Sequence, residues 1–173
     1  MSHHHESAAA GLPATVITVS DRSAAGERHD GSGPVAVEAL RGAGFAVGEP
    51  VVVADGADSV ASALREALAA GARLIITTGG TGVSPRDQTP EGTRGLLSRE
   101  IPGIAEELRR LDAVVKPTGM LARGLVGVVD PTPERPGALI ANLPGSPNAV
   151  ETGMPVILSV AAHIIAQLAG GDH

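Results

Sequence analysis

The fold class is clearest in RLIITTGGTGVSPRDQTPEG, which spans residues 73–92. A short apolar, β-branched run opens this stretch and predicts a buried strand over residues 73–78. The glycine turn Gly79-Gly80-Thr81-Gly82 follows, and a proline-punctuated loop then leads to a predicted helix that continues to about Leu97. A buried strand, a glycine turn and a helix in this order favour an α/β protein with a parallel sheet.

Strands and helices alternate on both sides of that stretch. Upstream, the predicted elements are a strand over 14–19, a long polar loop, a helix from Pro34, a strand over 47–54 and a helix capped by Asp58. Downstream, they are a helix over 102–114, strands over 125–129 and 138–143, and a last helix over 148–168 with a kink or break near Gly153 and Pro155. Such alternation implies right-handed crossovers and a mostly parallel sheet with helices on both faces.

The chain has 173 residues, 43% of them hydrophobic, which is about the size of one domain with its own core. We expect residues 1–13 to be a flexible segment and residues 14–170 to form a single domain. The run His3-His4-His5 in the first segment fits a disordered end, part of an expression tag or a metal-binding tract.

Charge, aromatic content and cysteine content exclude several classes of function. A net charge of -6, with Lys116 as the only lysine, leaves no broad basic surface for nucleic acid or an anionic membrane. Phe45 is the only aromatic residue, so recognition by base stacking is excluded as well. Without cysteine there is no disulfide, thiolate metal site or thiol nucleophile. We expect neither a signal segment nor an apolar run of the ~20 residues that a membrane span needs, and therefore a cytoplasmic protein.

Four polar loops are predicted at one edge of the sheet. Ligands of open parallel sheets bind outside the carboxyl ends of the strands. The loops at that edge span residues 20–33, 55–58, 79–89 and 143–148. Their coincidence indicates a ligand site more strongly than any one loop does.

The glycine turn at residues 79–82 is the best single candidate for binding an anion. Glycines let backbone N–H groups approach a phosphate, and the following helix adds the positive end of its dipole. The turn lacks the Lys of a Walker loop, and the spacing after Val19 is not that of a dinucleotide-binding strand. A tight strand-to-helix connection without a ligand is the alternative.

Two aspartates are candidates for holding magnesium beside this turn. Thr89 fits the helix N-cap, with Pro90 at the first helical position, which leaves Asp87 free for the metal. Asp55 ends its strand in a similar position, although Asp55-Gly56 also makes an ordinary turn. Helix caps and ligand contacts are both open for Asp30, Ser32 and Ser146.

Further motifs join these loops in order along the chain. They are Ser20-Asp21, DGSGP at 30–34, TTGGTG at 77–82 with PRDQTPE at 85–91, PG at 102–103 with Glu106 and Arg109, MLAR at 120–123 and LPGSPNAV at 143–150. Over nearly all of residues 15–168 the series resembles the molybdopterin-binding family of molybdenum-cofactor biosynthesis, which includes the molybdopterin adenylyltransferases and the G domain of gephyrin. The loop Lys116-Pro117-Thr118-Gly119 is less typical of that family.

The resemblance implies a three-layer α/β/α domain that assembles as a homotrimer and contacts other proteins of molybdenum-cofactor biosynthesis. It implies adenylylation of the terminal phosphate of molybdopterin by Mg-ATP, with release of pyrophosphate. Asp87 and Asp55 are then the catalytic residues and the ligands of Mg²⁺. The expected substrate-binding residues are Ser20, Asp21, Asp30, Ser32, Gly79, Gly80, Thr81, Gly82, Arg86, Arg123, Pro144, Gly145 and Ser146, and Arg22 is a further expected cation.

Three hypotheses for function remain. The chain is an adenylyltransferase, a non-catalytic pterin-binding member of the same fold, or an oligomeric scaffold whose loops only pack. The two aspartates favour the enzyme, because joining two polyanions requires charge neutralisation and in-line positioning more than a protein nucleophile.

Overall fold

The computed structural model describes residues 9–171. Its centre is a seven-stranded sheet in the order β2-β1-β4-β7-β6-β5, with β3 also paired to β1. The strands are β1 (Pro13–Val19), β2 (Ala46–Val47), β3 (Val51–Val53), β4 (Leu74–Thr78), β5 (Arg99–Glu100), β6 (Val126–Val129) and β7 (Ala138–Leu143). The pairs from β2 to β7 are parallel and those of β6 and β5 are antiparallel, which confirms the predicted mostly parallel sheet.

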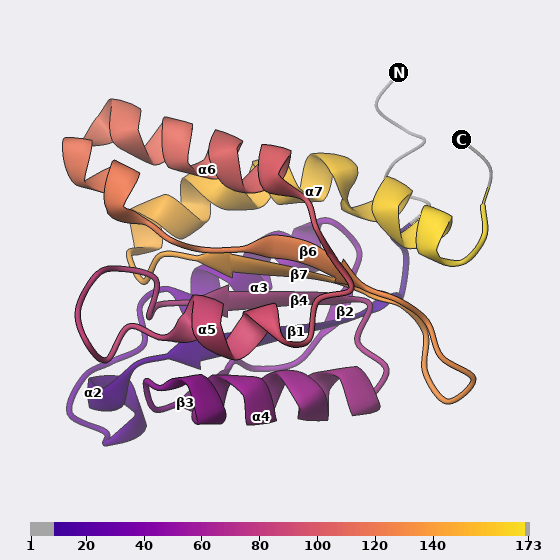
Figure 1. Cartoon of the computed structure of the whole chain (residues 1–173), viewed down its shortest axis with the longest axis horizontal. Helices are drawn as coiled ribbons and strands as arrows, with labels where there is room; N and C mark the ends of the chain where they lie inside the picture. Colours follow the sequence, from indigo (N-terminus) through magenta and orange to yellow (C-terminus); the bar gives the residue numbers. More distant parts are fainter. Residues whose placement is uncertain (1–8, 172–173) are drawn as a thin grey trace.

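Helices cover both faces of this sheet (Figure 1). They are α2 (Asp21–Ala24), α3 (Gly33–Gly42), α4 (Ala57–Ala69), α5 (Thr89–Arg94), α6 (Pro102–Val115) and α7 (Pro147–Leu168), with a 3₁₀ helix η1 (Pro117–Leu121). α3, α6 and α7 pack on one face, and α4 and α5 lie on the other. The expected three-layer α/β/α architecture is therefore confirmed.

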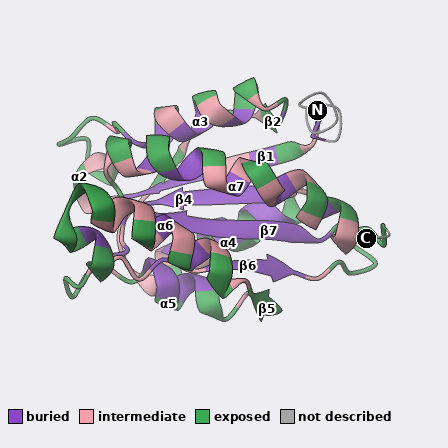
Figure 2. Cartoon of the chain, turned by 90° about the horizontal axis from the view of Figure 1, so that it is seen from above, coloured by how far each residue is buried: buried purple, intermediate pink, exposed green. Residues whose placement is uncertain are grey.

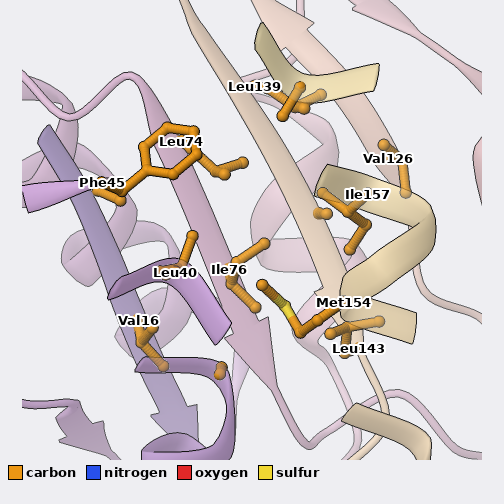
Figure 3. Packing of buried hydrophobic residues seen from close by; sticks show 14 of the residues in the cluster. Val16, Leu40, Phe45, Leu74, Ile76, Val126, Leu139, Leu143, Met154 and Ile157 are labelled. Atoms are coloured by element: carbon orange, nitrogen blue, oxygen red, sulfur yellow. The ribbon is translucent and has the colours of Figure 1, made fainter. Parts of the chain in front are cut away.

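Two apolar clusters hold the three layers together. Because side chains alternate along a strand, Leu74 and Ile76 face α3 and α7, whereas Ile75 faces α4. All residues of the central strands β4 and β7 are buried (Figure 2). In Figure 3 the Phe45 ring lies beside Leu74, and Met154 of α7 packs near Ile76. This buried centre fixes where the carboxyl ends of the strands lie.

The single strand predicted over residues 47–54 is wrong. β2 and β3 are separate strands that pair with different ends of β1, and the register shifts by one residue between them. Gly48, Glu49 and Pro50 occupy the gap. Pro50 has no N–H to donate to a sheet, so the pairing is interrupted there.

Two predicted helix caps are also wrong. The N-cap of α4 is Gly56, with Asp58 inside the first turn. Thr89 lies inside α5, whose N-cap is Gln88, and the Thr89 hydroxyl donates to the Gly79 carbonyl at 2.8 Å. A short polar side chain at a helix start can bond to several nearby backbone groups. The Thr89 hydroxyl bonds to Gly79 of the glycine turn and does not cap its own helix.

The last helix has no break at Pro155. α7 runs from Pro147 to Leu168 with Pro155 inside it. Pro155 is exposed, and the side chains of Met154 and Ile157 on either side of it are buried in the core. Packing of this face keeps the helix continuous where local sequence predicted an interruption. The short elements α2, β5 and η1 were not predicted.

α7 contradicts the expectation that no segment has the length and composition of a membrane span. Its 22 residues include a window with mean hydropathy 1.6. One face of α7, which includes Val150, Met154 and Ile157, is buried against the sheet and its neighbouring helices. That burial accounts for part of its apolar composition, since 33% of this window is buried.

The predicted flexible segment 1–13 is only partly covered by the structure. Residues 1–8, with the His3-His5 run, lie outside the described residues. Ala9 is buried, the Gly11 N–H donates to the Gly44 carbonyl at 2.9 Å, and β1 begins at Pro13. Residues 9–13 are thus held against the fold by burial and backbone pairing, which a composition argument did not predict.

Candidate functional site

The carboxyl ends of β1, β3, β4 and β7 open into one cavity of about 610 Å³. Each of the four predicted polar loops contributes to its wall. From the strand order, the loops after β3 and β1 lie at one end, the glycine turn after β4 in the middle and the loop after β7 beyond it. The end of α6 and η1 close the far wall, because α6 packs on α7 and β6.

The cavity gathers most of the predicted site residues. Those that line it are Ser20, Asp30, Ser32, Asp55, Gly79, Gly80, Thr81, Gly82, Asp87, Pro144, Gly145 and Ser146. Asp21, Arg22, Arg86 and Arg123 do not line it. Arg86 and Arg123 have protein partners, which are described below, whereas the Arg22 side chain has no ion pair or hydrogen bond within residues 9–171.

The glycine turn after β4 has an unusual backbone conformation. Gly79 and Gly80 have φ of +95° and +67°, which favour glycine. The turn is fixed to the start of α5, because the Thr89 N–H donates to the Gly80 carbonyl at 3.0 Å. Within residues 9–171, the N–H groups of Gly80, Thr81 and Gly82 have no hydrogen-bond acceptor. Three consecutive free N–H groups on a cavity wall are suited to an anion.

Carboxylates stand on both sides of these N–H groups. If Gly80 carried a Cβ, that atom would lie 3.2 Å from Asp55 Oδ1. A Cβ on Gly82 would lie 2.8 Å from Asp87 Oδ2. Asp87 Oδ2 also accepts a hydrogen bond of 3.1 Å from the Ser84 N–H. The predicted juxtaposition of the two aspartates at this turn is present.

Arg86 holds the Asp55 side of the site in place. Its guanidinium donates to both carboxylate oxygens of Asp21 at 3.0 and 2.9 Å and to the Asp55 carbonyl at 2.9 Å. The Asp21 N–H donates to Asp55 Oδ2 at 2.9 Å, and the Asp55 N–H donates to Asp21 Oδ1 at 3.1 Å. The hydrogen bond from Arg86 lowers the pKa of the Asp21 carboxyl below its ordinary value. Arg86 and Asp21 thus position Asp55 rather than line the cavity.

Arg123 holds the Asp87 side in the same way. It donates to the carbonyls of Gly82 at 2.8 Å and Asp87 at 2.7 Å, and it pairs with the Glu91 carboxylate. The hydrogen bond from Arg123 lowers the pKa of the Glu91 carboxyl. Two arginines expected to bind substrate therefore hold the loop at 79–89 through hydrogen bonds to its backbone and its neighbours.

The polar side chains at the helix starts both cap helices and line the cavity. Asp30 accepts from the N–H groups of Ser32 at 3.2 Å and Gly33 at 2.9 Å. Ser20 and Ser146 accept from backbone N–H groups in the first turns of α2 and α7, at 3.1 and 3.2 Å. Neither Ser20 nor Ser146 donates its hydroxyl proton to another described residue. Asp30 and Ser146 thus cap helices, Ser32 occupies the N-cap of α3 without a side-chain capping bond, and ligand contacts by these residues stay a prediction.

Several lining residues were not predicted. Three exposed basic residues on the wall form no ion pair in the described part of the chain: Arg28, His29 and Lys116. Arg28 and His29 belong to a predicted loop, so their neighbour Asp30 was a usable signal. Asp112 and Lys116 reach the cavity only through the packing of α6, for which the local sequence has no signal.

The carboxylates fit a magnesium ion that arrives with a phosphate ligand. Among residues 9–171, no three His, Cys, Asp or Glu side chains come together as a metal site. Asp55 and Asp87 supply carboxylate oxygens on either side of the glycine turn. Magnesium in nucleotide sites is held by one or two carboxylates plus substrate phosphates and water, and this donor set matches that pattern.

The fold and the site define an α/β domain with a cavity suited to an anionic ligand at the carboxyl edge of its sheet. A family model described as "Probable molybdopterin binding domain" matches residues 15–163, and the chain belongs to that family. The resemblance seen in the motifs is thereby confirmed.

Individual relatives agree with this assignment. The chain is 37% identical over 160 residues to the molybdopterin adenylyltransferase of Pyrococcus furiosus, with 87% of each protein covered. It is 37% identical over 166 residues to the molybdenum cofactor biosynthesis bifunctional protein of Synechococcus elongatus, and spans 96% of its own length but only 50% of that protein. The solved structure of the molybdopterin biosynthesis Mog protein from Mycobacterium ulcerans has a TM-score of 0.81 at 42% identity, covering 92% of this chain and 98% of that one.

Proposed function

We propose that this protein adenylylates molybdopterin with Mg-ATP and releases pyrophosphate. The observation that carries the proposal is the row of free N–H groups at Gly80, Thr81 and Gly82, with the Asp55 and Asp87 carboxylates on either side. A phosphate chain with a bound cation needs both features. The name of the Pyrococcus furiosus relative, molybdopterin adenylyltransferase, supports the same activity.

The reaction needs no protein nucleophile. An oxygen of the terminal phosphate of molybdopterin attacks the α-phosphorus of ATP, and the bond to the bridging oxygen breaks. The electron pair leaves with pyrophosphate. When bound between Asp55 and Asp87, magnesium would supply charge neutralisation for the phosphates. The chain itself fixes the phosphates with backbone N–H groups and offsets their charge with Arg28 and Lys116, which line the same cavity.

The strand order supports separate places for the two substrates. Asp55 lies after β3 and the glycine turn lies after β4, so ATP belongs at that end of the cavity. Ser146 lies after β7, toward α6, and its hydroxyl proton has no partner among the described residues. Molybdopterin then lies toward Ser146, with its terminal phosphate directed at the α-phosphate of ATP.

Pyrophosphate release tests the proposal against both alternatives. Purified protein, molybdopterin, ATP and Mg²⁺ should release pyrophosphate, and omission of any one component or addition of a chelator should abolish it. A non-catalytic pterin-binding protein binds molybdopterin but releases no pyrophosphate. A scaffold binds neither substrate, and either result contradicts the proposal.

We also propose a homotrimer that buries part of α7. Val156, Leu158 and Ile164 of α7 are only half-buried. A second, largely apolar cavity of about 860 Å³ lies between α3 and α7, with Phe45 and Leu158 in its wall. Apolar surface of this extent favours a partner. The name of the bifunctional Synechococcus elongatus relative supports a contact with other proteins of molybdenum-cofactor biosynthesis.

A further inference from the structure

Asp112 on the far wall of the cavity has no role in the chemistry proposed above. It lies on α6, is half-buried and lines the cavity. Asp30, Asp55 and Asp87 each accept a hydrogen bond from a backbone N–H. The Asp112 carboxylate accepts no hydrogen bond from any residue of 9–171. Among the described residues that line the cavity, it is therefore the one carboxylate with both oxygens free of a protein hydrogen bond.

Exposed aliphatic side chains line the cavity together with Asp112. Val115 and Leu121 line the same wall and are 74% and 50% exposed, and Val83 on the facing loop is 68% exposed. Exposed aliphatic side chains at a cavity mouth gain free energy when a flat apolar surface covers them. The wall thus offers a carboxylate next to an aliphatic surface, which matches a flat heterocycle with N–H groups on one edge.

We propose that Asp112 selects the pterin ring of the substrate, with Val115 and Leu121 covering a face of that ring. The inference rests on the proposed function. The amino-pyrimidinone edge of a pterin presents a ring N–H beside an exocyclic amino group, and one carboxylate accepts from both. The same edge of adenine presents a donor beside an acceptor, so a carboxylate gains only one hydrogen bond and meets a lone pair.

Position and electrostatics agree with this choice. Asp112 lies at the α6 end of the cavity, beyond β7, whereas Asp55 lies at the β3 end. Burial raises the pKa of the Asp112 carboxyl, and the charge of the neighbouring Lys116 opposes that rise. Lys116 thus favours the ionised form that accepts two hydrogen bonds, and partial burial strengthens bonds to that form.

Calorimetric titration of Asp112→Asn separates the pterin from the nucleotide. The variant should bind molybdopterin about tenfold more weakly or worse, because an amide accepts only one of the two hydrogen bonds. Its affinity for Mg-ATP should stay within about twofold, since adenine gains little from this carboxylate. Glu106→Gln is the matched control, because Glu106 is exposed on the same helix and does not line the cavity. It should leave both affinities unchanged.

The preference of the protein between two ring systems is a second test. A merely structural role of Asp112 would not change that preference. Hydroxymethylpterin and hydroxymethyllumazine differ in that lumazine carries an oxygen where pterin carries the amino group. The wild type should prefer the pterin, and Asp112→Asn should lose or reverse that preference, because its amide N–H can donate to the lumazine oxygen. An unchanged preference in Asp112→Asn overturns the inference.

The outcomes separate this inference from the proposed function. If the wild type binds molybdopterin and releases pyrophosphate but Asp112→Asn binds molybdopterin equally well, only the inference fails. Equal weakening of molybdopterin and Mg-ATP also overturns it, because the effect would then be structural. If the wild type binds no molybdopterin, the proposed function fails and the inference fails with it.

Discussion

Replacement of Gly79 by alanine should destabilise the protein strongly, because the backbone leaves no room for a side chain there. The positive φ of +95° costs an alanine about 1–3 kcal/mol. The new Cβ would also lie under 3.0 Å from the Val19 carbonyl oxygen, which belongs to the neighbouring strand β1. Relief requires a shift of that strand, and overpacking of this kind costs about 1–3 kcal/mol more. We expect a total loss of about 2–6 kcal/mol in the free energy of unfolding.

Urea unfolding followed by circular dichroism measures this loss. Gly42→Ala is the matched control, because Gly42 ends α3, is exposed and has no atom within 4 Å of an added Cβ. Alanine there should be neutral or stabilise the protein by up to about 1 kcal/mol. A loss below about 0.5 kcal/mol for Gly79→Ala, well under the strain expected at positive φ, would refute the close approach of the turn to β1. An equal loss in both variants would refute it as well.

The remaining predictions concern turnover, substrate placement, assembly and pH. The free energy of unfolding of Asp87→Ala should stay within about 1 kcal/mol of wild type, since the variant loses one exposed hydrogen bond. Its release of pyrophosphate should be at least about 100-fold slower. Turnover at the wild-type rate would disprove the role of Asp87. In calorimetric titrations, Asp55→Ala should mainly weaken magnesium-dependent ATP binding and Ser146→Ala mainly molybdopterin binding, and equal or crossed losses would contradict this layout. Light scattering at micromolar concentration should report a trimer, and a monomeric mass would contradict the proposed assembly. Arg86 lowers the pKa of Asp21 in the folded state, so the stability from this pair is present above the ordinary value of 3.8 and is lost as pH falls through the folded pKa. The difference in melting temperature between wild type and Arg86→Gln should therefore shrink in acid. A difference that stays constant with pH would exclude the pair as its cause.

The cavity was predictable to the extent that it follows from strand direction. Parallel strands end at one edge, so Asp55 after one strand and the glycine turn after another were expected to meet, although they lie far apart in sequence. The free N–H groups at 80–82 follow from the glycine spacing. These inferences needed only the order of the elements.

Partner choice could not be predicted from residue type. The sequence indicated that Arg86 and Arg123 were cations near the site, but their hydrogen bonds go to protein groups that the fold brings near. Asp21 and Asp55 become partners only once β1 and β3 pair. Asp112 comes from a helix whose packing against α7 is a tertiary contact without a local signal. The missed interactions are all of this long-range kind.

Transfer of the labelled α-phosphate of ATP to molybdopterin is the decisive measurement for adenylylation. Purified protein is incubated with Mg²⁺, molybdopterin and ATP that carries a label on its α-phosphate, and the pterin product is separated. We expect labelled adenylyl-molybdopterin in a one-to-one ratio with pyrophosphate, and no label in the pterin product of Asp87→Ala. Label that stays in ATP or appears only as free AMP, with molybdopterin unmodified, would contradict it.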